Sequence, residues 1–240
     1  MKEIIPAIDR AVILDELSKL DMLRTTRHGA NEIYIFNAQS SPNLMREVGR
    51  LRELSFRSGG GGSGNELDVD ADDMAQDGYE QLIAWDPVAQ EIIGGYRYII
   101  SHEKHPHHMS TEHYFKFSEL FREDYLPYTI ELGRAFVQLK YQASGDSRSI
   151  YALDNLWDGL GALGIIRPDM KYFFGKMTMY PDYNRQARDL IQHFLFKHFK
   201  DEENLVTPVD PIVIETPASY MDGILTEKEF KDDYKLLNAE

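Results

Sequence analysis

The sequence predicts a mixed α/β fold in which a central mixed sheet carries helices on both faces. Residues 79–85 and 91–101 have the pattern of two strands joined by a turn at Asp86-Pro87, as in an antiparallel hairpin. A further strand, residues 129–139, is followed by alternating helix and strand patterns. Hairpins early in the chain and βα units late in it favour such a mixed sheet.

The elements before the hairpin follow from the spacing of apolar residues. Residues 7–20 have apolar side chains three and four apart, which predicts an amphipathic helix outside the main sheet or at its edge. Residues 31–36 alternate between apolar and polar side chains, so we expect the first strand there. Ser41-Pro42 is typical of a helix start, and this helix is expected to run to about Arg57.

Two unusual segments lie between this helix and the hairpin. Residues 58–64 contain only glycine and serine, which is the composition of an engineered linker or of a natural mobile loop. Residues 66–73 alternate acidic and apolar side chains but lack the later glycine and glutamate of an EF-hand loop. We therefore expect these carboxylates to pair with nearby arginines.

The strand at residues 129–139 carries charge inside an apolar pattern. It contains Glu131, Gly133 and Arg134 among β-branched and large apolar residues. A buried carboxylate and guanidinium must pair or lose their charge, and a glycine inside a strand often marks a bulge. This strand is therefore either the site of a structural ion pair or part of an active site.

The segments after this strand predict further helices and strands. A helix is expected from about residues 147–149 to Pro168, a strand at 172–179, a helix beginning at Pro181-Asp182 and a strand at 212–214. The apolar face of the first of these helices comprises Ile150, Leu153, Trp157, Leu160 and Leu163.

Composition excludes several classes of protein. The 240 residues carry a net charge of −14, and residues 201–240 hold 11 acidic against 3 basic side chains, so a nucleic-acid binder is not expected. The absence of cysteine excludes a disulfide framework and thiolate chemistry. The chain also lacks a leader-like start and a long apolar run, which leads us to expect a soluble cytoplasmic protein with no transmembrane segment.

A metal site is not expected. Five histidines lie between residues 102 and 113, but Pro106 interrupts them. They also lack the helical pair with a carboxylate partner that is typical of zinc sites. We expect a solvated loop in this region.

The charged residues together resemble a pattern of the GNAT acyltransferase superfamily. The motifs follow in a shared order: Arg52-x-x-x-Phe56-Arg57, Asp68/Asp70/Asp73, Gly95-Tyr96-Arg97, Glu131-x-x-Arg134 and Leu156-Trp157. The chain most resembles the hemolysin-like N-acyltransferases that make ornithine- or glycine-type aminolipids, distant relatives of the acyl-homoserine lactone synthases. Such relatives have a glycine-rich connection before the aspartates, so residues 59–64 are interpreted as native.

The resemblance implies a GNAT-like sheet and three parts of the chain. These are an N-terminal helical extension (1–30), the acyltransferase domain (31–200) and an acidic C-terminal extension (201–240). It also implies transfer of a fatty, often 3-hydroxylated, acyl group from acyl carrier protein to the amine of an amino acid. The donor would be acyl-phosphopantetheine on the carrier protein or an acyl-CoA, with no tightly bound cofactor.

The superfamily's loop for the pyrophosphate of acetyl-CoA is only partly present, as Gln142-x-x-Gly145. A single phosphate needs fewer backbone donors than a pyrophosphate does, so this loop fits a carrier-protein donor. The helix expected near residues 147–149 offers its N-terminus to that phosphate, with Arg148 beside it.

The chemistry of acyl transfer suggests roles for the central strand. A thioester carbonyl needs a hydrogen-bond donor, which the N–H groups of a bulged strand at Ala135–Val137, including that of Phe136, would supply. The same edge would pair with the pantetheine amides. Glu131 is either the base that takes the proton of the amine or an anchor for Arg134 or Arg97.

The carboxylate of the acceptor requires a cation, and Arg52, Arg97 and Arg134 are the candidates; their alternative is to pair with the aspartates. The resemblance places Phe56, Asp70 and Asp73 in the substrate site. It also places Tyr183, or Tyr180, where the leaving thiolate needs an acid, and ordinary packing is the alternative for both.

Two other functions stay open: acetyl-CoA-dependent N-acetylation of a small molecule, and a catalytically inactive GNAT-like binding module. The expected partners are acyl carrier protein and an amino-acid acceptor, with at most a peripheral membrane contact. An acidic carrier protein requires a basic docking surface. The candidates for it are Lys140, Arg148, Arg167, Lys171 and Lys176.

Overall fold

The computed structural model describes residues 1–101, 109–142, 151–180 and 182–239. The chain forms two compact units, Met1–Met109 with Leu126–Lys176, and Ser110–Tyr125 with Met177–Glu240. Each unit is discontinuous in sequence. The division at residues 30 and 200, which follows the linear chain, stays a prediction.

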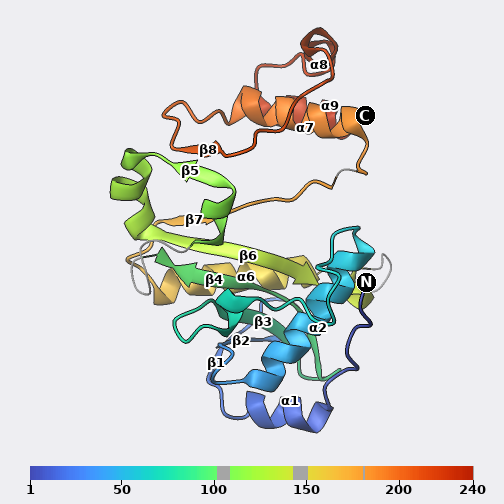
Figure 1. Ribbon diagram of the computed structural model, residues 1–240, viewed down its shortest axis with the longest axis vertical. Helices are drawn as coiled ribbons and strands as arrows, with labels where there is room; N and C mark the ends of the chain where they lie inside the picture. Colours follow the sequence, from blue (N-terminus) through green and yellow to red (C-terminus); the bar gives the residue numbers. More distant parts are fainter. Residues whose placement is uncertain (102–108, 143–150, 181, 240) are drawn as a thin grey trace. The chain divides into compact units, whose positions relative to one another are not determined.

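A six-stranded mixed sheet forms the centre of the first unit, as the sequence predicts (Figure 1). The strand order is β1-β2-β3-β4-β6-β7, and all neighbours are antiparallel apart from the parallel pair β6 and β7. The strands are β1 (Met22–Thr25), β2 (Glu32–Phe36), β3 (Glu80–Asp86), β4 (Glu91–Ile100), β6 (Thr129–Val137) and β7 (Tyr172–Gly175). The β3–β4 hairpin is confirmed, and β1 is a strand that the sequence analysis missed.

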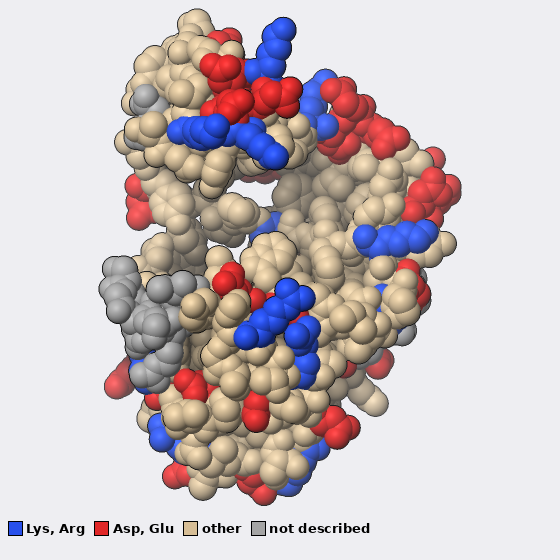
Figure 2. All heavy atoms as spheres, turned by 180° about the vertical axis from the view of Figure 1, so that it is seen from behind, with Lys and Arg blue, Asp and Glu red and all other residues tan. Residues whose placement is uncertain are grey.

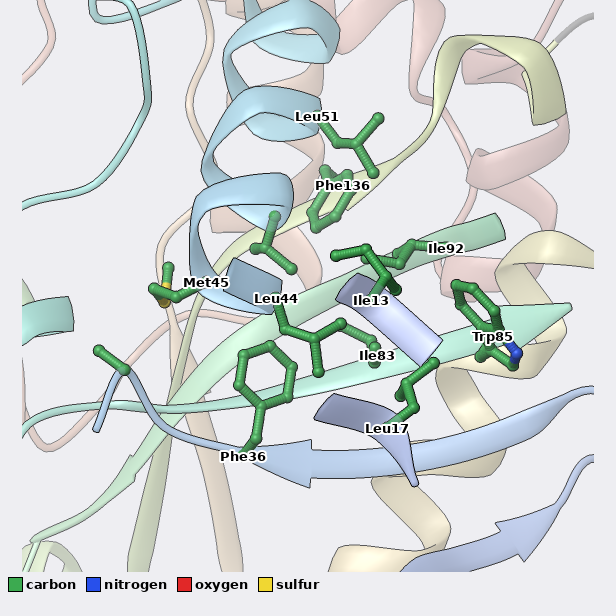
Figure 3. Close-up of a cluster of buried hydrophobic side chains, with 12 residues drawn as sticks. Ile13, Leu17, Phe36, Leu44, Met45, Leu51, Ile83, Trp85, Ile92 and Phe136 are labelled. Atoms are coloured by element: carbon green, nitrogen blue, oxygen red, sulfur yellow. The ribbon is translucent and has the colours of Figure 1, made fainter. Parts of the chain in front are cut away.

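Helices cover both faces of this sheet, as predicted. They are α1 (Arg10–Leu17), α2 (Pro42–Ser58), α3 (Ala71–Met74) and α6 (Ala152–Ile166), with short turns η3 (Leu126–Tyr128) and η4 (Leu139–Tyr141). On one face α1 and α2 pack over a buried cluster that includes Leu51, Trp85 and Phe136 (Figure 3). On the other face Leu156 of α6 joins a second cluster with Leu82.

The start of α2 is fixed by a residue of α1. Pro42 opens the helix, but the Ser41 side chain makes no capping hydrogen bond. Instead, the carboxylate of Glu16 accepts from the backbone N–H of Asn43 at 3.0 Å and of Leu44 at 2.8 Å. This contact makes α1 part of the core, where the sequence analysis placed it outside the sheet or at its edge.

Leu163 of α6 is buried as predicted, but two other residues of the predicted apolar face are exposed. Trp157 is 64% exposed and Leu153 is 59% exposed, whereas Leu156 is buried. A Cβ at Gly159 would collide with a methyl group of Leu82, so the helix backbone lies close to β3. A pattern of large apolar side chains predicts that these side chains face the sheet. Where the helix backbone packs closely on the sheet, however, only a small residue such as Gly159 fits at the contact.

The second unit has its own small sheet and core. Its elements are η1 (Ser110–His113), β5 (Phe115–Phe117), η2 (Phe121–Tyr125), α7 (Arg185–His198), β8 (Val206–Pro208), α8 (Ala218–Ile224) and α9 (Phe230–Leu237). β5 pairs with β8, and Leu190, Phe194 and Met221 are buried together. The strand predicted at residues 212–214 is wrong, because the strand in this region is β8 and residues 211–215 have no regular structure.

The close approach of β4 and β6 requires glycine at position 94. A Cβ there would collide with the carbonyl oxygen of Phe136, which belongs to the backbone and cannot swing away. We expect Gly94→Ala to lower the free energy of unfolding by about 1–3 kcal/mol, as overpacking does in other cores. Urea unfolding followed by circular dichroism measures this loss.

Gly161→Ala is the matched control, because nothing lies within 4 Å of a Cβ at that position of α6. Alanine there is expected to raise stability by up to about 1 kcal/mol through its higher helix propensity. Equal losses at both positions would contradict the steric argument.

Candidate active site

A bulge lies in β6 beside the charged residues, as the sequence predicts for this strand. Arg97 of β4 is opposite Gly133, whereas Gly95 is opposite Phe136, so β6 has one extra residue between these pairs. Arg134 lies in this bulge with a left-handed backbone, at φ 50°. Residues other than glycine rarely adopt this conformation. The local backbone of β6 is therefore unusual at the residue that also carries a charge.

Beyond the bulge, β6 has an open edge. β7 pairs with β6 only from Thr129 to Leu132, because β7 ends at Gly175 and is shorter than predicted. β6 itself continues to Val137. The N–H of Gln138 donates to the carbonyl of Ile93 at 2.8 Å. Neighbouring N–H groups in a strand point to opposite sides, so the N–H of Val137 faces away from β4. It faces the side of β6 on which β7 no longer pairs at this position.

A buried ionic cluster lies on the α2 face of the sheet. Arg52 from α2 and Arg97 from β4 both contact Asp73, at 3.3 and 3.2 Å. Arg97 also donates to both carboxylate oxygens of Asp70 at 2.9 Å. The side chain of Gln81 donates to Asp73 at 3.1 Å and accepts from Arg52. The predicted pairing of the arginines with the acidic residues 66–73, here called the aspartate segment, is confirmed.

Arg134 joins this cluster from the bulge. Its guanidinium donates to Asp68 and, at 2.6 Å, to Asp70. The side chain of Arg134 is 27% exposed, whereas those of Arg52 and Arg97 are buried. Asp70 also caps α3 through reciprocal hydrogen bonds with Asp73. The aspartate segment is therefore held in place by contacts at both of its ends.

Burial and the facing carboxylates set the charge states in the cluster. Although burial opposes the change, Asp73 and Asp70 raise the pKa of Arg97. Burial, together with the charge of Arg52, lowers the pKa of Arg134 to about 10. Burial also opposes ionisation of Asp73, yet Arg52 and Arg97 lower its pKa. These groups are consequently ionised at neutral pH.

Glu131 lies on the same face of the sheet and has a different partner. It is fully buried, and its carboxylate accepts a short hydrogen bond from the Tyr79 hydroxyl. The ring of Tyr79 lies against Arg97, with the guanidinium carbon 4.2 Å from the ring centroid. Arg97 and Arg134, the partners that the sequence offered for Glu131, form ion pairs with aspartates.

Comparison with known proteins identifies the family of this chain. Residues 51–151 match the family model of the acetyltransferase (GNAT) domain. A protein of Phocaeicola vulgatus named glycine N(alpha)-acyltransferase is 50% identical over 100% of this chain and 76% of its own length. The chain belongs to the GNAT N-acyltransferases. A protein of Bacteroides thetaiotaomicron with the same name is 48% identical over 100% of this chain and 73% of its own length. No solved structure matches the chain significantly.

As a GNAT enzyme the protein is an acyltransferase, and its domain implies an acyl-CoA or acetyl-CoA type of thioester donor. Of the residues predicted to hold the donor, Phe136 turns its side chain into the core (Figure 3), and by the same alternation its N–H faces β4, which leaves the N–H of Val137 as the candidate donor. The Gln142 side chain donates to the carbonyl of Val137 at 2.5 Å. Gly145 and Arg148 lie outside the described residues, as does the helix start predicted at 147–149.

Two further predicted GNAT site residues have ordinary packing contacts. Phe56 is partly buried against the cluster beneath α2. Tyr183 belongs to the second unit, where its ring packs edge-on against Tyr180 with centroids 5.6 Å apart. Its catalytic role stays a prediction. Of the five histidines considered for a metal, His113 is the one within the described residues.

Three buried residues of this GNAT fold were not predicted from the sequence: Tyr79, Gln81 and Glu53. Glu53 is buried beside the cluster, accepts from the N–H groups of Ser63 at 2.9 Å and Gly64 at 2.8 Å, and pairs with Arg57 at 2.6 Å. These contacts tie the glycine-rich segment to α2. Glu53 and Arg57 are four residues apart on one helix, and this spacing could have predicted their ion pair from the sequence.

The surface of this GNAT enzyme carries charge of both signs. On the face seen in Figure 2, basic side chains are interspersed with acidic ones. Within the described parts of the chain, no helix has both the length and the apolar character needed to cross a membrane.

Proposed function

We propose that this enzyme transfers a fatty acyl group from a thioester donor to the amino group of glycine, which gives an N-acylglycine of the aminolipid type. The observation that carries the proposal is the similarity to two proteins named glycine N(alpha)-acyltransferase, at 50% and 48% identity over the whole chain. The bulge and the ionic cluster lie within residues 51–151, the part that matches the GNAT domain.

The reaction requires a neutral amine and a polarised thioester carbonyl. In our proposal Glu131 takes one proton from the ammonium of glycine, and the N–H of Val137, within the predicted segment Ala135–Val137, stabilises the oxyanion. The C–N bond then forms and the C–S bond breaks. The thiolate leaves with the second proton of the amine, so the amide and the free thiol are the products.

We propose acyl carrier protein, loaded with a 3-hydroxyacyl group, as the donor. The open edge of β6 suits the amides of a pantetheine arm, which would pair with it as an added strand. Lys140 and Lys176 follow β6 and β7 in the chain. Because these strands are parallel, both lysines lie at the end of the sheet where the edge opens. An acidic carrier protein is attracted by such cations.

The two lysines give a specific prediction for carrier-protein binding. Charge reversal in Lys140→Glu/Lys176→Glu should weaken binding of acyl carrier protein by about tenfold or more at low salt, and less at high salt, because the attraction is screened. Surface plasmon resonance at two ionic strengths measures this.

Lys171→Glu is the matched control for that experiment. Lys171 was also a docking candidate from the sequence, but it precedes β7 and lies at the other end of the strand pair, with its ammonium 4.0 Å from the centre of the Tyr128 ring, so we exclude it from the proposed docking site. It should leave binding unchanged. If both variants weakened binding equally, the carrier protein would not dock specifically at this end of the sheet.

The proposed function is tested by thiol release with purified enzyme, and the products are identified by mass spectrometry. The donors are 3-hydroxyacyl carrier protein, the matching acyl-CoA and acetyl-CoA, each offered with glycine, ornithine, serine and alanine. N-acylglycine from the carrier protein supports the proposal. Turnover with acetyl-CoA alone assigns the enzyme to small-molecule N-acetylation, and a product with another amino acid in place of glycine overturns the acceptor.

A further inference from the structure

A pocket lies beside the buried Glu131. Its volume is about 250 Å³, and it is lined by residues 75–79, Asp72 and Ile99. Ile99 is opposite Glu131 in the pairing of β4 and β6, so the pocket lies directly beside that part of the central strand. A volume of this size is sufficient for a small acceptor such as glycine.

The wall of the pocket is fixed by backbone hydrogen bonds. The N–H of Tyr79 donates to the carbonyl of Asp72 at 3.1 Å, and the N–H of Gly78 donates to that of Ala75 at 3.1 Å. The side chain of Gln39 donates to the carbonyl of Ala75 at 3.2 Å. These contacts join the turn after α3 to the start of β3 and to the segment before α2.

Tyr79 connects this pocket with Glu131. It lines the pocket, is only 1% exposed, and donates its hydroxyl proton to the carboxylate of Glu131. The guanidinium of Arg97 lies over its ring, and Asp72 and Asp77 line the pocket with it. Two carboxylates at the pocket favour a cationic group such as a primary ammonium.

We propose that this pocket binds the acceptor's ammonium group and that Tyr79 is a catalytic residue that carries its proton to Glu131. The inference rests on the proposed function. The ammonium gives one proton to the Tyr79 oxygen while the hydroxyl proton of Tyr79 moves to the Glu131 carboxylate. Tyrosine is thus neutral before and after the step, Glu131 becomes a carboxylic acid, and the amine is left with the lone pair that attacks the thioester carbonyl.

Tyr79→Phe tests the relay because it keeps the ring and removes the hydroxyl. With glycine as acceptor, we expect kcat to fall by about 10²-fold or more, the magnitude typical of acid–base groups, with an unchanged KM for the donor. The pH profile separates this from a structural effect. Between about pH 7 and pH 9 the rate of the variant should rise about tenfold per unit, because only the amine already neutral in solution reacts, while the wild-type rate changes little.

Tyr96→Phe is the matched control. Tyr96 is also a buried tyrosine, on neighbouring β4, but its side chain belongs to the cluster on the α6 face and its hydroxyl has no partner among the described residues. Its loss should leave rate and pH profile unchanged. A Tyr79→Phe enzyme with the wild-type rate or the wild-type pH profile overturns the relay. An inactive wild-type enzyme instead overturns the proposed function.

A second pair of variants tests the pocket without touching the hydroxyl. Ala75→Phe should fill the pocket and raise the KM for glycine about tenfold or more, with the KM for the donor unchanged. Ala71→Phe adds the same side chain at the exposed start of α3, outside the pocket, and should change neither constant. An unchanged KM for glycine in Ala75→Phe would place the acceptor elsewhere.

Discussion

Glu131→Gln is expected to lower kcat by about 10²- to 10⁴-fold with an unchanged KM for the donor, because a general base typically contributes this much. Glutamine has nearly the same shape as glutamate and still accepts a hydrogen bond from Tyr79, whose hydroxyl bonds to the native carboxylate. It cannot take a proton. Steady-state kinetics with glycine and an acyl-thioester donor, alongside the melting temperature, measure the effect.

Glu16→Gln is the control for this substitution. Glu16 is another buried glutamate with hydrogen bonds to backbone N–H groups, but it caps the start of α2 and lies outside the candidate site. Its replacement should lower the melting temperature and leave kcat of the folded enzyme unchanged. If Glu131→Gln retained more than about a tenth of the wild-type kcat, Glu131 would be a structural residue.

Arg52→Ala is expected to lower the free energy of unfolding by about 3–5 kcal/mol, the cost of removing one partner from a buried ion pair. Arg52 is completely buried, and its removal takes away one of the two guanidinium groups that compensate Asp73. Gln81 would also lose the donor to its side-chain carbonyl. Urea unfolding at neutral pH measures the loss.

Lys19→Ala is the comparison for Arg52. It breaks the pair with Asp15, which is four residues away on a solvent-exposed surface, with both side chains 65% exposed. Such pairs contribute about 0.3–0.5 kcal/mol. A cost below about 1 kcal/mol for Arg52→Ala would mean that the remaining partners, Arg97 and Gln81, compensate Asp73 by themselves.

The sequence predicted the strand pattern and the pairing of the charged residues because both follow from local chemistry. Arginines inside apolar strands require buried carboxylates, and the acidic residues at 66–73 were the carboxylates expected to pair with them. The partners of Arg97 and Arg134 and the bulge in β6 were predictable in this way. A charged residue inside an apolar strand also marked Glu131 as a candidate for a special role.

Other features depend on contacts between distant parts of the chain and could not be read from a local pattern. The cap of α2 comes from Glu16 in place of Ser41. Tyr79 directly precedes the apolar strand β3, where an aromatic residue is most often ordinary core, and its hydroxyl partner is 52 residues away. The buried side of α6 depends on how closely its backbone approaches β3, which spacing alone does not indicate.

The left-handed backbone of Arg134 has a consequence for the dynamics of the strand edge. A residue other than glycine in this conformation costs about 1–3 kcal/mol, which its surroundings must offset. Here the offset comes from the side chain of the same residue, through Asp68 and Asp70. The aspartate segment therefore holds the backbone of β6 in its bulged form. When Asp68 and Asp70 lose their contacts with Arg134, the bulge relaxes, and amide hydrogen exchange at Ala135–Val137 should quicken together with exchange in residues 68–73.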